Sequence, residues 1–155
     1  MTIVTRVPYD YQYTALVGVA VYVFAYYEWA VINLIEQFKP GFVDTYCRGA
    51  PMTSWSVKHE LEVVLADPQT SYTVVVKSAL EACVQELARL IHKRNALIHA
   101  HPITDHDGSQ ILNYQARLDR PLPDMKWPVA EIEAIISEFD MAANSANELL
   151  HRLLK

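Results

Sequence analysis

The sequence predicts an all-α protein, a four-helix bundle with a small β-hairpin or extended insertion between the third and fourth helices. Of its 155 residues, 52% are hydrophobic and 20% are charged, a composition that excludes a disordered chain. Its four glycines are too few for the many turns of an all-β protein. Long stretches carry apolar residues at helical spacing. We therefore expect one domain over residues 1–155.

The first two helices are predicted from apolar stretches that end at Pro and Gly signals. The first helix covers about residues 9–38 and stops at a Lys-Pro-Gly sequence. The stretch 41–52 contains Gly and Pro and is predicted to be a loop. The second helix covers residues 53–66, with Thr53 or Ser54 as its N-cap.

The last two helices are longer and amphipathic. Thr70 or Ser71 is expected to cap the third helix, whose apolar residues continue at helical spacing to Leu97. Pro128, at a first-turn position, is expected to open the fourth helix. The apolar stripe of that helix is broad enough to pack against two neighbours.

Between these helices the helical period is lost. The sequence Asp105-His106-Asp107-Gly108 is a turn signal, and it lies between residues 101–104 and 111–117. This arrangement predicts the small hairpin. The same turn contains Asp and His side chains, but their spacing matches no familiar ligand motif, so we expect neither a metal nor a cofactor.

The first helix has the most apolar stretch of the chain, and Ala15 to Tyr27 carries no charge. The run is shorter than the ~20 apolar residues of a membrane span, and Glu28 follows it. We therefore expect a helix buried in a bundle or dimer interface, with a membrane span as the alternative. Two cysteines and the absence of a signal-like N-terminus predict a reducing, cytoplasmic location.

Residues 89–101, with the sequence RLIHKRNALIHAH, hold three Lys/Arg and three His and no acid. The formal net charge of the chain is −5, so RNA binding would have to come from such a local patch. The patch falls at the C-terminal end of the third helix, where cations also stabilise the helix dipole. Stabilisation of the helix dipole is a sufficient explanation for Arg89 and Lys93. It explains Arg94, Asn95 and His99 less well.

Arg94, Asn95 and His99 are residue types that phosphate chemistry uses. Arginine pairs with phosphate oxygens, asparagine orients groups, and histidine moves protons near neutral pH. Asn95 and His99 share a helix face, whereas Arg94 and His99 are offset by about 140° on a straight helix. Arg94 can reach the helix face of Asn95 and His99 if the helix frays or tightens before Pro102.

The sequence Arg94-Asn95-Ala96-Leu97-Ile98-His99 resembles the signature of the HEPN superfamily. That signature is an arginine, commonly followed by a polar residue, with a histidine five positions after the arginine. The context is also similar, because the motif lies late in a long helix before a small insertion and a closing amphipathic helix. The resemblance covers roughly residues 10–154.

The resemblance implies a metal-independent endoribonuclease that acts as a homodimer, a class that includes toxins and phage-defence effectors controlled by antitoxin proteins. His99 would be the general acid–base, Arg94 would stabilise the transition state, and Asn95 would position His99 or the phosphate. The products would be a 2′,3′-cyclic phosphate and a 5′-hydroxyl. The alternative is a non-catalytic HEPN-like binding module, in some relatives partnered with a nucleotidyltransferase-type protein.

Three further residues complete the predicted site. Lys93 and His101 flank the motif and are expected to contact RNA. Glu28 is expected to support the site by pairing with Arg94 or another cation, because a buried carboxylate is costly unless it is paired. The alternative is that Glu28 reaches the surface at one edge of its helix. The dimer interface is expected on the apolar surface of the first and last helices.

Overall fold

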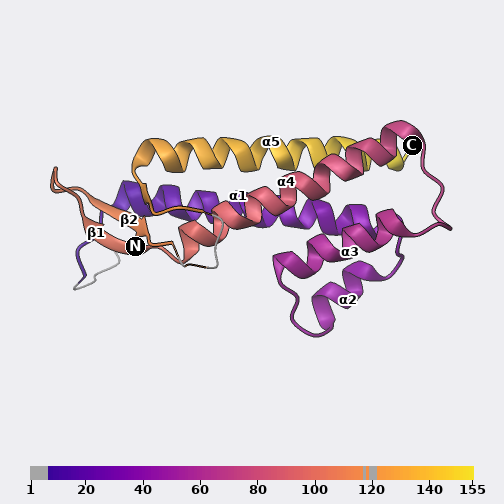
Figure 1. Ribbon diagram of the computed structural model, residues 1–155, viewed down its shortest axis with the longest axis horizontal. Helices are drawn as coiled ribbons and strands as arrows, with labels where there is room; N and C mark the ends of the chain where they lie inside the picture. Colours follow the sequence, from indigo (N-terminus) through magenta and orange to yellow (C-terminus); the bar gives the residue numbers. More distant parts are fainter. Residues whose placement is uncertain (1–6, 117, 119–121) are drawn as a thin grey trace.

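Three long helices set the axis of the molecule. They are α1 (Tyr11–Glu36), α4 (Val74–Ile98) and α5 (Val129–Leu153). Figure 1 shows them running along the long axis, with a small sheet at one end. Two shorter helices, α2 (Phe42–Arg48) and α3 (Ser54–Ala66), lie toward the other end. The expected mostly helical architecture is therefore confirmed, but the described part of the chain has five helices in place of four.

The structure is a computed structural model and describes residues 7–116, 118 and 122–155. Arg117, the last residue of the predicted hairpin arm 111–117, lies outside the described residues. Within the described chain, the buried apolar side chains form one continuous cluster that spans all the long helices and two strands of the sheet.

Helix α1 is the central element of this cluster. Asp10 caps it by accepting a hydrogen bond from the backbone N–H of Tyr13 at 2.8 Å. Its most extensive contact is with α5, where the rings of Phe24 and Phe139 meet edge to face with centroids 5.0 Å apart. By length and composition α1 is the one described helix that could cross a membrane, and one of its faces is buried in the bundle.

The prediction of a loop over 41–52 is wrong for residues 42–48, because α2 forms there, and is confirmed for residues 49–52. Glu36, at the end of α1, accepts hydrogen bonds from the backbone N–H groups of Gly41 and Val43 at 2.9 and 2.8 Å. These bonds lower the pKa of Glu36 and satisfy the open N-terminus of α2. Gly41 adopts a left-handed backbone at φ 89°, and Phe42 is buried. The cap comes from a different helix, so α2 has no local start signal.

The starts of α3 and α4 follow from their caps. Thr53 is the N-cap of α3 and forms a capping box with Ser56. The N-cap of α4 is Thr73, so the prediction of Thr70 or Ser71 is wrong by two or three residues. The reason is Tyr72, whose hydroxyl donates to the backbone oxygen of Val64 at 2.6 Å and holds the connection in a non-helical conformation.

The insertion is an antiparallel sheet of three strands in the order β1-β2-β3, namely β1 (His101–Thr104), β2 (Gln110–Tyr114) and β3 (Met125–Trp127). The predicted hairpin is confirmed, with Thr104 opposite Gln110 across the turn. Strand β3 was not predicted, because three residues are too few to show the alternation of apolar and polar side chains that identifies a strand. Pro128 is the N-cap of α5 rather than a first-turn residue.

One tyrosine joins the sheet to the bundle. The buried hydroxyl of Tyr13 donates to the backbone oxygen of Trp127 at 2.6 Å and accepts from the backbone N–H of Leu112 at 2.8 Å. Burial raises the pKa of Tyr13, so the phenol remains a donor at neutral pH. A single side chain of α1 therefore fixes both β2 and β3.

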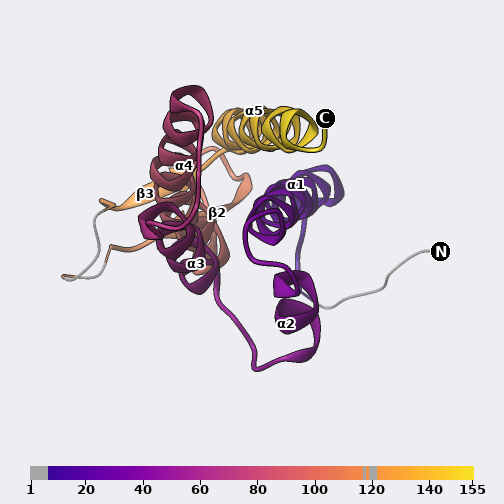
Figure 2. The ribbon, with the colours of Figure 1, turned by 90° about the vertical axis from the view of Figure 1, so that its right-hand side faces the viewer.

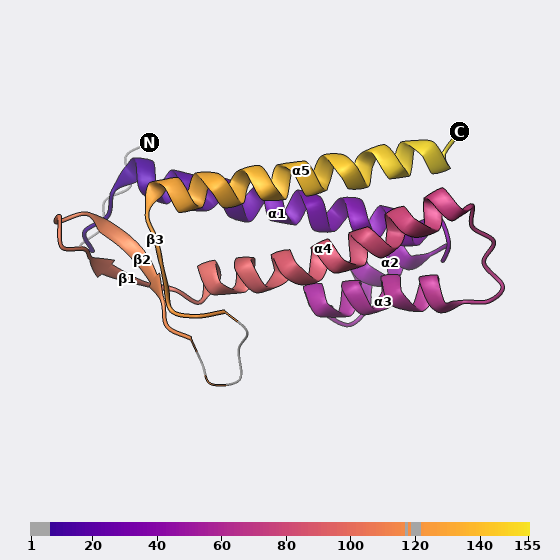
Figure 3. The ribbon, with the colours of Figure 1, turned by 45° about the horizontal axis from the view of Figure 1, so that its top comes forward.

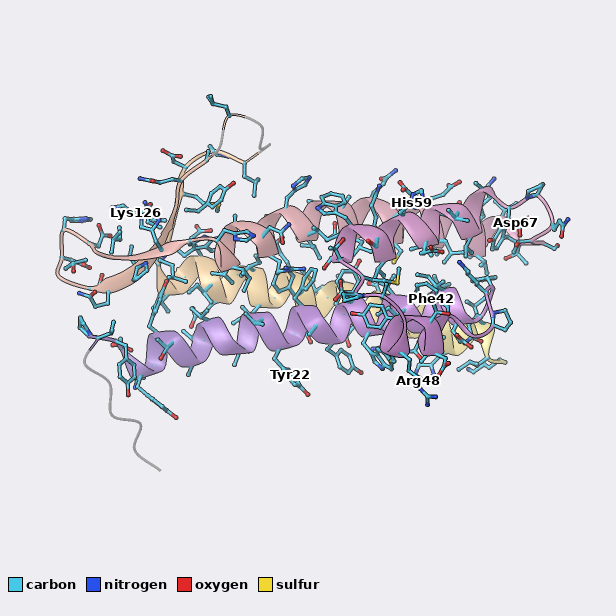
Figure 4. The ribbon with its side chains drawn as sticks, turned by 90° about the horizontal axis from the view of Figure 1, so that it is seen from below. Tyr22, Phe42, Arg48, His59, Asp67 and Lys126 are labelled. Carbon is cyan, nitrogen blue, oxygen red and sulfur yellow. The ribbon has the colours of Figure 1, made fainter. Side chains whose placement is uncertain are left out.

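We expect Tyr13→Phe to lower the free energy of unfolding by about 1–3 kcal/mol, because the partly buried N–H of Leu112 and the buried carbonyl of Trp127 lose their partner. Urea denaturation measures the change. Tyr22→Phe is the matched control: Tyr22 is 73% exposed on the same helix, and Figure 4 shows it pointing away from the bundle. Equal stability of the two variants would contradict this role of Tyr13.

Candidate functional site

Arg94 lies on the inner side of α4 and is held by two different groups, a hydroxyl and an aromatic ring. Its Nη2 donates a short hydrogen bond to the hydroxyl of Ser54, the first residue of α3. Its guanidinium carbon lies 5.0 Å from the ring centroid of Phe24 of α1, a cation–π geometry. Its Nε is buried and has no hydrogen-bond partner. Arg94 is thus a partly desolvated, oriented cation with a donor still unused.

Arg94 lines a pocket of about 450 Å³ between α1, α3 and α4. Figure 3 shows α3 running alongside α4, with the start of α3 facing the C-terminal half of α4. Glu28 of α1 and Asn95 line the same pocket. The Oε1 atom of Glu28 is also buried without a partner. The structure therefore brings Glu28, Arg94 and Asn95 to one place.

His99 is placed apart from this pocket. Helix α4 continues to Ile98, and the backbone N–H of His99 still bonds to the Asn95 carbonyl at 2.9 Å. The helix therefore does not fray before His99, and the offset of about 140° from Arg94 is retained. His99 is exposed, as is His101 at the start of β1. Within one chain, Arg94 and Asn95 share a pocket that His99 does not line.

Lys93 faces α5. Its ammonium contacts both carboxylate oxygens of Glu138 at 2.7 and 2.8 Å, and Arg89 reaches the same carboxylate at 2.6 Å. Arg89 also pairs with Glu86. The stretch 89–101, which holds no acid in sequence, is therefore neutralised in part by acids from outside it. Among the described residues, Arg94 is the cation of this stretch with no carboxylate ion pair.

Sequence analysis missed three residues that the fold brings to the site. Ser54, 5% exposed, holds Arg94, although its sequence position indicated only a helix cap. Trp55 lines the pocket beside it. Tyr46 of α2 is close enough to sense both charges: burial raises the pKa of Tyr46, the carboxylate of Glu28 raises it further, and Arg94 opposes the change. No local pattern identified these contacts, because each partner lies on another helix.

The Asp105 turn forms a small ion-pair network of its own. Lys126 bonds to the Asp105 carboxylate at 2.5 Å, and His106 lies 2.9 Å from the same carboxylate. These contacts and a backbone hydrogen bond lower the pKa of Asp105. Over residues 7–116, 118 and 122–155, no group of three His, Cys, Asp or Glu side chains is arranged to hold a metal ion.

No protein-family model matches the chain, and no curated protein or solved structure matches it either. We therefore infer function from the residues themselves. The pocket offers a fixed guanidinium, a carboxylate and an amide side by side, with an aromatic wall. Such a set can bind a polar ligand with both donors and acceptors, and its oriented cation can stabilise negative charge without further reorganisation.

The Glu138 network predicts a pH dependence. Burial alone would raise the pKa of Glu138, but hydrogen bonds from Lys93 and Arg89 outweigh it and hold the pKa below its ordinary value. The stabilisation is therefore complete above the ordinary Glu pKa of about 4.3 and is lost as the pH falls through the lower, folded-state value.

We expect Glu138→Gln to lose less stability than wild type between neutral and acidic pH, as measured by urea denaturation at several pH values. Glu133→Gln is the control, because Glu133 is an exposed carboxylate on the same helix. If wild type and Glu138→Gln lose the same stability at acidic pH, the assignment of this pH dependence to the Glu138 ion pairs is contradicted.

Removal of the Ser54 hydroxyl tests the anchoring of Arg94. We expect Ser54→Ala to lower the free energy of unfolding by about 1–3 kcal/mol, because a second guanidinium N–H then lacks a partner. Thermal or urea denaturation measures it. Ser78→Ala, at an exposed position of α4, is the control and should change stability far less.

Proposed function

We propose that the protein is a metal-independent endoribonuclease whose phosphate-stabilising group is Arg94. The observation that carries the proposal is the state of this guanidinium: it is fixed by Ser54 and Phe24, has no carboxylate ion pair among the described residues, and has an unused donor at Nε. A preorganised cation of this kind is suited to the charge that develops on a phosphorane-like transition state. The Arg-Asn-x-x-x-His resemblance supports the same assignment.

In the proposed reaction, His99 removes the proton of a ribose 2′-hydroxyl, and the 2′-oxygen attacks the adjacent phosphorus. The bond from phosphorus to the 5′-oxygen breaks, and His99 returns the proton to that oxygen. The products are a 2′,3′-cyclic phosphate and a 5′-hydroxyl. Asn95, which lines the pocket of Arg94, would orient the phosphate. Lys93 and His101 remain the proposed RNA contacts outside this pocket, and Lys93 would have to exchange its pairing with Glu138 for a phosphate.

The proposed reaction needs a second copy, because His99 does not line the pocket of Arg94 within one chain. We propose a homodimer in which His99 and Arg94 of two copies face one cleft. The exposed face of α1 supports it, since it is uncharged and aromatic around Val19, Tyr22, Tyr26 and Trp29. Met141 of α5 is exposed as well. A cytoplasmic toxin or defence effector, held by an antitoxin protein, remains the proposed setting.

A specific observation favours a second candidate, a non-catalytic binding module. Arg94 is already hydrogen-bonded within its own chain to Ser54, and α4 stays helical up to His99. In this case the pocket binds a ligand or partner, for example a nucleotidyltransferase-type protein, and His99 has no role in chemistry. The two candidates differ in one measurable property, RNA cleavage.

We expect the wild-type protein to cleave a mixed RNA pool in the presence of EDTA and to leave cyclic phosphate ends. His99→Ala should lower the cleavage rate by about 10²–10⁴-fold, the usual contribution of acid–base catalysis. Arg94→Lys should also lower it, because an ammonium lacks the planar fork of donors. Product ends are read by chemical analysis of the fragments.

His59→Ala, at an exposed histidine of α3, is the matched control and should cleave like wild type. Equal cleavage by wild type and His99→Ala would sink the assignment of His99. Absence of cleavage by the wild type would favour the binding module.

A further inference from the structure

Two residues that line the Arg94 pocket have buried polar atoms without a hydrogen-bond partner. In the described part of the chain, three buried side-chain N or O atoms lack a hydrogen-bond partner, and two of them belong to residues that line this pocket. One is an acceptor, Oε1 of Glu28, and the other is a donor, Nε of Arg94. Buried polar atoms are normally paired, so an unpaired acceptor and donor in one pocket indicate a ligand that supplies both complements.

The chemistry of the two groups narrows that ligand. A carboxylate accepts two hydrogen bonds from adjacent donors, and a guanidinium donates to an acceptor. Guanine offers this pattern on one edge, with N1–H and the N2 amino group beside the O6 acceptor. Adenine has only one donor group there, and uracil and cytosine place a carbonyl oxygen where it would face the carboxylate. A phosphate alone supplies acceptors for Arg94 but no donor for the carboxylate of Glu28, so it would complement only one of the two groups.

The walls of the pocket suit a flat base. Trp55 lines it, and its ring is packed edge to face against His92 with centroids 4.9 Å apart. The sequence next to the Arg94 motif has few aromatics, but the fold brings the Trp55 ring of α3 to it. Unstacked bases of single-stranded RNA are bound by aromatic stacking and by hydrogen bonds to their pairing edge.

We propose that this pocket binds a guanine base, with Glu28 accepting from N1–H and N2–H, Arg94 donating to O6, and Trp55 contacting the ring. The inference that this pocket selects which RNA is cut rests on the proposed function. The inference that the pocket binds guanine depends only on the residues that line it. Glu28 is then a specificity residue for guanine rather than only a support for Arg94.

Binding of the four ribonucleoside 5′-monophosphates to the full chain tests the proposal by isothermal titration calorimetry. All four carry the same phosphate and ribose, so any difference reports the base. GMP should bind at least about tenfold more tightly than AMP, CMP or UMP, which is the scale of discrimination by paired hydrogen bonds to a base. Glu28→Gln keeps the shape of the side chain but replaces one acceptor with a donor, and it should abolish most of this preference.

Glu81→Gln is the matched control, since Glu81 is an exposed carboxylate on α4, and it should retain the GMP preference. Equal binding of the four nucleotides, or a GMP preference unchanged in Glu28→Gln, would overturn the guanine pocket whether or not RNA is cleaved. A GMP preference that Glu28→Gln removes supports the pocket even if the wild type cleaves no RNA, and in that case only the nuclease proposal fails. If the wild type cleaves RNA but binds the four nucleotides equally, the nuclease proposal is supported and the guanine pocket is overturned.

Discussion

Burial of one face of α1 connects the separate parts of the molecule. Along its length this helix packs on α5, fixes β2 and β3 through Tyr13, and places Phe24 and Glu28 next to Arg94 of α4. These contacts come from different turns of one rigid rod, so the sheet, the bundle and the pocket share a common frame. A 26-residue helix with an apolar face can do this because its burial stabilises every neighbour at once.

The other constraint is the cation that this frame encloses. Arg94 is held by a hydroxyl and an aromatic ring, which are neutral partners, while the nearby carboxylate of Glu28 makes no hydrogen bond at its buried oxygen. A fully paired guanidinium and carboxylate would neutralise each other and leave little for a ligand. Here both groups keep unused hydrogen-bonding capacity in a polar pocket. That arrangement favours binding over purely structural stabilisation, because burial of unpaired polar atoms is costly to the fold.

The basic stretch 89–101 does not form a basic surface in the folded protein. Residues 89–101 form the basic stretch of an acidic chain, yet Arg89 and Lys93 turn to Glu138 of α5. What remains is a local site centred on Arg94 rather than a broad basic surface. A ligand would therefore be recognised by a few directed hydrogen bonds and by stacking more than by general attraction to phosphates.

The sequence by itself determined the elements that depend on local periodicity and capping: the three long helices, the short α3 that begins at Thr53 or Ser54, and the hairpin around Gly108. It also singled out Arg94, Asn95 and Glu28 as residues of interest. Only the tertiary structure decided that these three meet in one pocket with Ser54 and Trp55, that His99 lies apart, that Lys93 is paired, and that α2 and β3 form. The reason is physical, since helical period and caps act within a few residues, whereas each of these contacts joins segments that are distant along the chain.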